Sequence, residues 1–121
     1  MTEDDILAFV RGAIGSAWAL ELLLLLQREP GRGWTADALV RELRGSLPLV
    51  TDSLERLTAA GLVAQNESGE HLYRPQSHER AELVSALAGL YASKPIAVLR
   101  AIFATPSDKI RSFADAFLFK K

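Results

Sequence analysis

The feature that most constrains the fold is the stretch SLERLTAAGLV at residues 53–63. Leu54 and Leu57 are three residues apart, the spacing of neighbours on one face of an α-helix. Gly61 follows where a residue in the left-handed conformation would end that helix. Leu62 then begins a short apolar stretch that predicts a β-strand. The chain here is therefore expected to pass from a helix, through a glycine, directly into a strand.

The flanking residues extend this unit in both directions. Ser46 is an expected N-cap for a helix over about 46–60, and Pro48 fits its first turn because the missing N–H would have had no partner there. One face of the helix is expected to point inward, and it carries Leu47, Val50, Leu54 and Leu57. Residues 62–65 and 71–74 predict two short strands around an NESG hairpin turn.

Two further helical regions precede this unit. Apolar residues at spacings of three and four predict helix over residues 3–28, with a break near residue 15 where Ser16 caps a second segment. A loop rich in proline and glycine follows. Thr35 is the expected N-cap of a short helix, and Gly45 is expected to end it.

The C-terminal third is predicted to be helical as well. Its apolar pattern indicates one helix over about 78–93, a second over 96–104, and a last one capped by Ser107. The last helix has an apolar side formed by Ile110, Phe113, Ala114, Phe117 and Leu118.

Length and composition limit the possible functions. A chain of 121 residues with 49% hydrophobic residues is expected to fold as one domain, residues 1–121. Its net charge of −1 provides no global attraction to nucleic acid or to an anionic membrane, so DNA binding would need a local basic patch. The longest apolar run, Leu22–Leu26, is far shorter than a membrane-spanning helix, and the acidic start MTEDD does not resemble a signal peptide. We expect a soluble, cytoplasmic protein.

The order helix, helix, turn, helix and hairpin over residues 16–75 resembles the winged helix-turn-helix of bacterial transcription regulators. The stretch TADALVRELRGSLPLVTDSLERLTAAGLVAQ is similar to the multiple-antibiotic-resistance and phenolic-acid regulator families. The resemblance implies a mostly α fold, with a three-helix core and a two-stranded wing at 16–75 and additional N- and C-terminal helices. It also implies a regulator that binds double-stranded DNA by placing the helix at about 46–60 in the major groove.

The chemistry of the expected DNA-reading surface is mixed. Arg56 can hold a phosphate or read a guanine, whereas Asp52 can accept only from a cytosine amino group and repels phosphates. The wing sequence NESGE offers no lysine or arginine, and Arg28 and Arg32 in the loop before the short helix are further candidate cations, unless they pair with neighbouring glutamates. The residues expected to contact DNA are Arg41, Arg44, Ser46, Pro48, Leu49, Thr51, Asp52, Ser53, Arg56 and Arg74.

The C-terminal extension, residues 76–121, is the expected dimerisation region. A winged helix is complete by about residue 75, so the apolar surface beyond it needs a partner. In regulators of the type it resembles, terminal helices form a homodimer that sets the spacing of DNA half-sites. The candidate dimer residues are Ile96, Leu99, Phe103, Phe113 and Phe117. Alternatively, these helices pack back onto the protein's own N-terminal helix, and both arrangements are compatible.

A second function remains open from the sequence. A winged helix without a basic surface would act as a protein-interaction module, docking a partner through Pro48, Leu49 and the C-terminal helices. An enzyme is not expected, because no nucleophile, base and orienting residue form a recognisable set. The chain has no cysteine, and His71 and His78 match no metal-ligand spacing, so neither a metal nor a cofactor is expected.

Overall fold

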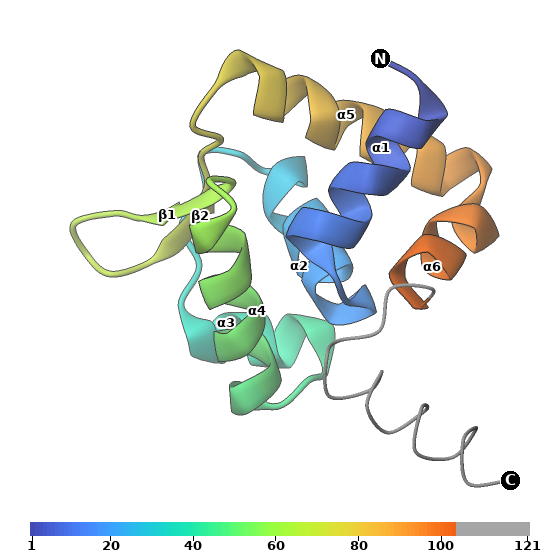
Figure 1. The fold of residues 1–121 in the computed structure, drawn as a ribbon. Helices are drawn as coiled ribbons and strands as arrows, with labels where there is room; N and C mark the ends of the chain where they lie inside the picture. The colour runs from blue at the N-terminus through green and yellow to red at the C-terminus, as the bar shows by residue number, and fades with distance from the viewer. Residues whose placement is uncertain (104–121) are drawn as a thin grey trace, which may run out of the picture.

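The structure, a computed structural model, describes residues 1–103 and is mostly helical with one small antiparallel sheet (Figure 1). This confirms the predicted fold class. The elements in order are α1 (Glu3–Phe9), the π-helical turn η1 (Val10–Ile14), α2 (Ala17–Arg28), α3 (Ala36–Leu43), α4 (Leu47–Ala59), β1 (Val63–Gln65), β2 (His71–Tyr73), α5 (His78–Ser93) and α6 (Pro95–Phe103). The predicted last helix, with Phe113 and Phe117, lies outside the described residues.

The predicted break near residue 15 is confirmed. Gly15 adopts a left-handed conformation with φ of 71°, and its N–H donates to the carbonyl of Val10 at 2.9 Å. The Ser16 hydroxyl then accepts from the N–H of Ala19 at 3.0 Å and caps α2. The chain bends by 105° between the first helical segment and α2. Such a bend needs glycine, because a side chain at positive φ is strained.

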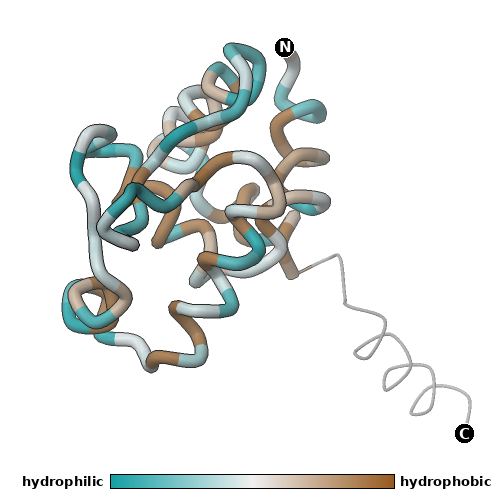
Figure 2. Tube along the Cα trace, turned by 90° about the vertical axis from the view of Figure 1, so that its left-hand side faces the viewer, coloured by the Kyte–Doolittle hydropathy of each residue, from teal (hydrophilic) through white to brown (hydrophobic). Residues whose placement is uncertain are grey.

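Helix α2 forms the centre of the core. Its leucines lie inside on nearly every side, as the uniformly apolar sequence predicts. Helices α3 and α4 pack against it and against each other, and β2 also contacts it. Hydrophobic and hydrophilic residues alternate along the turns of the trace (Figure 2), as expected for helices that bury one face.

Helix α4 begins at its predicted cap, but two of its residues point the opposite way from the prediction. Ser46 accepts from the N–H of Leu49 at 3.4 Å, and Pro48 lies in the first turn. Leu47, predicted to be inward, is the first residue of the helix and is 51% exposed. Ser53, predicted to be outward, is 6% exposed. The buried stripe comprises Val50, Ser53, Leu54 and Leu57.

The turn between α3 and α4 also differs from the prediction. Thr35 caps α3 as expected, accepting from the N–H of Ala38 at 3.1 Å. The left-handed residue at its C-terminus is Arg44, with φ of 54°, and not Gly45. Gly45 is instead crowded by an aromatic ring, since a Cβ atom on it would lie 2.9 Å from Cζ3 of Trp18. Glycine at position 45 therefore leaves room for that ring.

The wing is a hairpin, and a third segment pairs with β2 at its first residue, next to the turn. β1 pairs antiparallel with β2, with Ala64 opposite Leu72, and Gly61 exits α4 at φ of 77° as predicted. Trp34 forms an isolated bridge with His71, in which the two residues exchange N–H···O bonds of 2.8 and 2.7 Å. No periodicity in the sequence predicts this third segment.

Helices α5 and α6 pack back on the N-terminal helices, as one of the two predicted arrangements requires. α5 contacts α1, and α6 contacts both η1 and α1. The Tyr91 hydroxyl on α5 donates to Glu21 on α2 at 2.9 Å, and this hydrogen bond is the main cause that raises the pKa of Tyr91. The hairpin and α6 lie on opposite sides of the helical core (Figure 1).

Candidate nucleic-acid interface

The outward side of α4 is the candidate reading surface. Its first turn and its middle expose Leu49, Asp52, Glu55 and Arg56. Leu49 is 41% exposed, which is sufficient for an apolar side chain to contact a thymine methyl group. The buried position of Ser53 removes it from this surface, so Ser53 is the one predicted contact residue that the structure places inside.

Four arginines predicted to contact phosphates are all exposed, namely Arg41, Arg44, Arg56 and Arg74. In the described part of the chain, the salt bridges join Arg32 to Glu29, His78 to Glu82, and Lys94 to Glu3, so none of the four forms one there. Their guanidinium groups have donors available for phosphate oxygens.

Arg32 behaves differently from these four. Its Nη1 lies 2.9 Å from Glu29 Oε2, and its guanidinium stands 3.6 Å from the centre of the Trp34 ring. A cation held by a carboxylate and an aromatic face attracts phosphate less than a free one. The alternative that loop arginines pair with neighbouring glutamates therefore holds for Arg32.

Two hydroxyl groups on α4 are already engaged within the helix. The Ser46 oxygen accepts the capping hydrogen bond, and the Thr51 hydroxyl donates to the carbonyl of Leu47 at 2.8 Å. Both side chains are exposed at the helix surface. The Thr51 oxygen can still accept a hydrogen bond, but its proton is engaged.

Acidic groups flank the arginines. Asp52, Glu55 and Arg56 line a hollow of about 570 Å³ beside the start of α2, where Ser16 and Trp18 form the facing wall. In the wing, Asn66 Nδ2 donates to Glu70 Oε1 at 3.1 Å, which holds that carboxylate against the turn. The surface is therefore a mixture of separate cationic and anionic points, and contact with a polyanion would depend on the arginines.

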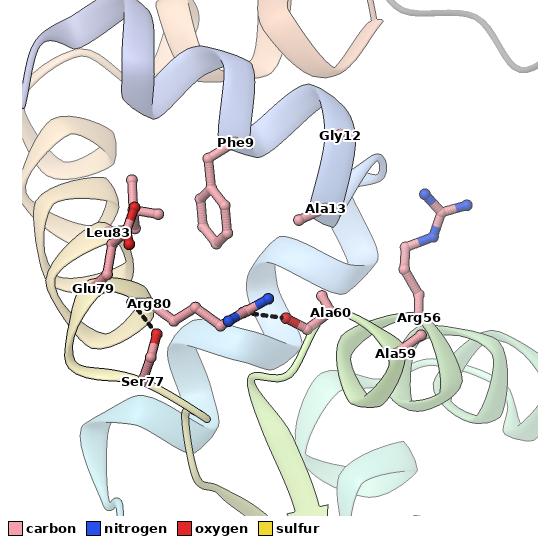
Figure 3. A pocket seen from close by; sticks show the side chains of 10 residues that line it. All are labelled: Phe9, Gly12, Ala13, Arg56, Ala59, Ala60, Ser77, Glu79, Arg80 and Leu83. Atoms are coloured by element: carbon pink, nitrogen blue, oxygen red, sulfur yellow. Dashed lines mark hydrogen bonds between the residues drawn. The ribbon is translucent and has the colours of Figure 1, made fainter.

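Arg56 differs from the other exposed arginines because it also contacts the N-terminal helices. Its guanidinium lies in the space that a Cβ atom on Gly15 would fill, at the junction of η1 and α2. It lines one hollow together with Trp18 and a second together with Phe9. In the second hollow its guanidinium points away from Phe9 (Figure 3). This residue therefore connects the outward surface of α4 with the N-terminal helices, and no local sequence pattern indicated the contact.

The candidate dimer residues divide into three groups. Ile96 and Phe103 on α6 are 60% and 72% exposed. Leu99 is half-buried and packs against the core. Phe113 and Phe117 lie outside the described residues. The apolar side chains of Ile96 and Phe103 are therefore left uncovered by the described chain.

The remaining expectations concern metals and membranes. Among residues 1–103, no group of three or more histidine, aspartate or glutamate side chains could hold a metal ion. In the same range no single helix has the length and apolar character needed to cross a bilayer, although two sharply bent helix pairs pass that length and composition criterion together.

Comparisons with known proteins support the fold. No protein family matches this chain, and no curated protein matches it by sequence. A solved structure of a possible transcriptional regulator from Methanosarcina mazei Go1 superposes with a TM-score of 0.50 at 17% identity, covering 83% of this chain and 88% of that one. The chain therefore shares its overall fold with that protein over most of both chains.

Proposed function

We propose that this protein is a transcription regulator that binds double-stranded DNA by placing α4 in the major groove. The observation that carries the proposal is the set of four exposed arginines, Arg41, Arg44, Arg56 and Arg74, which form no salt bridge within residues 1–103. Phosphate neutralisation supplies most non-specific DNA affinity, and unpaired surface cations serve it best. Likeness to a possible transcriptional regulator supports the same function.

The regulator is proposed to be of the multiple-antibiotic-resistance and phenolic-acid type. On this proposal Arg56, Thr51, Asp52, Pro48 and Leu49 face the bases and nearby phosphates. Arg41, Arg44, Ser46 and Arg74 position the DNA backbone. No chemical step belongs to this function, and it requires no cofactor.

A salt titration tests the proposal. Fragments of genomic DNA are selected on the full-length protein, and the affinity of a retained duplex is measured between about 50 and 200 mM salt, where binding should weaken steeply. Arg56→Ala is expected to reduce the slope of log K against log salt by about 1. Arg100→Ala, which removes an exposed cation from α6, is the matched control and should leave the slope unchanged. If the protein retains no duplex at the lowest salt, the proposal is wrong.

The proposed regulator acts as a homodimer joined through its C-terminal helices. Ile96 and Phe103 present apolar surface on α6, which lies on the side of the core away from the hairpin (Figure 1). An interface there would leave both α4 helices and both wings accessible to DNA. Two-fold pairing of this kind matches the symmetry of palindromic half-sites.

The exposed first turn of α4 favours a second candidate function. Leu47, Pro48 and Leu49 are all exposed and form a small apolar patch at the start of the helix. A protein-interaction module would use this turn to dock a partner. Binding of a stoichiometric protein partner that is abolished by Leu49→Asp and unaffected by Arg56→Ala would favour this function over DNA binding.

A further inference from the structure

The hollow of about 570 Å³ beside α4 has an apolar wall. This wall is formed by the half-buried Trp18 ring and by Leu49, which is 41% exposed. Leu47 and Pro48 are exposed in the same turn of α4. The hollow is therefore an apolar groove that the described chain leaves open to solvent.

Carboxylates surround the indole ring in this groove. Asp52 and Glu55 line the hollow together with Arg56. A smaller hollow of about 310 Å³ shares the same ring and is lined by Glu21 and Glu42, with no basic side chain in its wall. None of these four carboxylates forms a salt bridge within residues 1–103. Four carboxylates and one guanidinium give the surface around the ring a net charge of −3, which favours a basic partner.

The C-terminal segment of the chain has the complementary chemistry. Its sequence predicts a helix from about residue 107 with one apolar side, which carries Phe113 and Phe117. At about 3.6 residues per turn, basic side chains flank the apolar side and the two aspartates of the segment fall on the opposite side. The flanking basic residues are Lys109, Arg111 and Lys120, and the aspartates are Asp108 and Asp115. An apolar side with a basic rim is complementary to an apolar groove with an acidic rim.

The described chain ends in a helix that packs close to the hollow. Phe103 is the last residue of α6, and α6 contacts η1. η1 leads through Gly15 into Ser16, which lines the hollow. From Phe103 to Phe117 the chain can span about 21 Å as a helix and up to about 50 Å if extended, compared with about 30 Å for the width of a small domain. The segment is therefore long enough to reach the hollow of its own chain.

We propose that residues 107–118 dock in this hollow of their own chain and cover part of the α4 surface. Phe113 and Phe117 pack against the Trp18 ring, and the flanking cations face the carboxylates. Docking within one chain is favoured over docking between copies, because a short connection gives an effective concentration on the order of mM. The two phenylalanines thus serve an intramolecular contact in place of the dimer interface predicted for them. The covering of α4 from DNA rests on the proposed function, whereas the docking itself does not.

The docking is tested on the full-length protein with a spin label. The chain has no cysteine, so Ser112→Cys gives a single attachment site on the side of the predicted helix opposite the apolar one. In NMR spectra the label should broaden the indole N–H resonance of Trp18 more strongly than that of Trp34, the other tryptophan of the chain. Equal broadening of the two resonances, or none of either, overturns the proposal.

A mixture of two samples separates docking within a chain from docking between copies. Isotope-labelled protein without a spin label is mixed with spin-labelled protein of natural isotope content, so that only contacts between copies cause broadening. No broadening of Trp18 is expected in the mixture. Broadening as strong as in the single sample would mean that a second copy supplies the segment, and the intramolecular contact would be wrong.

Two phenylalanines of the segment give a matched pair of variants. Phe117 belongs to the apolar side of the predicted helix, whereas Phe119 falls on the opposite side. In the spin-labelled protein, Phe117→Asp is expected to abolish the broadening of Trp18 and Phe119→Asp to preserve it. Unchanged amide resonances of the hairpin show that both variants are folded. If both variants keep the broadening, or both lose it, the apolar side does not make the contact and the proposal is wrong.

Release of the segment should raise the affinity for a duplex selected by the protein. Phe117→Asp is expected to bind several-fold more tightly than the wild type, because a larger fraction of molecules has α4 uncovered. The added negative charge alone would weaken DNA binding, and Phe119→Asp, which carries the same charge, measures that effect. Equal DNA affinity of the two variants overturns the covering of α4. Failure of every form to bind DNA contradicts the proposed function instead, because the spin-label measurement still decides whether the segment docks.

Discussion

The Arg56 guanidinium lies in the space that a Cβ atom on Gly15 would occupy. The two residues are far apart in the sequence, and the contact joins the candidate DNA-reading helix to the bend between η1 and α2. Gly15 serves this contact in two ways, since it adopts φ of 71° and leaves room for the arginine.

Gly15→Ala is therefore expected to lower the free energy of unfolding by about 1–2 kcal/mol, the usual penalty for a side chain in the left-handed region. Arg56 can swing away because its end is flexible, so the clash itself should add little. Gly69→Ala is the matched control, because Gly69 has φ of 81° and open space around it. Urea denaturation measures both, and a loss at Gly15 several kcal/mol larger than at Gly69 would mean that Arg56 cannot move.

Ser53→Ala tests the revised position of Ser53. The side chain is buried and forms no side-chain hydrogen bond within the described residues, so removing its hydroxyl is expected to change stability by less than about 0.5 kcal/mol or to raise it slightly. DNA affinity should not change. A loss of DNA binding without a loss of stability would return Ser53 to the contact surface.

The stability of the protein should depend on pH through His71. Burial lowers the pKa of this imidazole from its usual 6.5, because desolvation penalises the charged form. Below pH of about 6.5 the unfolded chain binds a proton that the folded chain resists, so the free energy of unfolding falls as the pH decreases toward the folded-state pKa. His71→Gln is expected to flatten this part of the profile, measured by urea denaturation between about pH 5 and 8. A variant that keeps the wild-type slope would contradict this origin.

Charge placed on the exposed side of α6 should separate the proposed homodimer. Ile96→Asp and Phe103→Asp both replace exposed side chains, so the monomer fold should tolerate them while an apolar interface would not. Sedimentation equilibrium should give a dimer dissociation constant that is at least about tenfold lower for the wild type than for either variant. Leu47→Asp, an exposed leucine on α4, is the control. A dimer unaffected by the α6 variants would exclude this face.

Much of the fold follows from local patterns. Leu54, Leu57 and Gly61 predicted a helix with a glycine exit, and the caps at Ser16 and Thr35 were found because N-capping depends on neighbouring residues. These elements are correct because their signals lie within a few residues of the structure that they determine.

The errors arise where distant segments meet. Ser53 is buried because α4 packs against both α2 and α3, so its buried stripe is wider than its leucines indicate. The bridge between Trp34 and His71 joins segments far apart in the chain, and no periodicity reports such a pairing. The contact of Arg56 with Gly15 is missed for the same reason. Nine of the ten residues predicted to contact DNA are exposed and Ser53 is buried, and the contacts themselves stay a prediction.

The turn at residues 44–45 makes two separate demands for glycine, and the chain meets only one of them. Position 45 requires glycine for space beneath the Trp18 ring, and position 44 would favour glycine for its left-handed backbone, yet the chain has arginine there. Arg44→Gly should therefore raise the melting temperature by relieving about 1 kcal/mol of backbone strain, while it removes a cation from the proposed DNA surface. Under selection for heat resistance alone, position 44 is expected to change to glycine. If arginine is retained under selection for regulation, activity outweighs stability at this position.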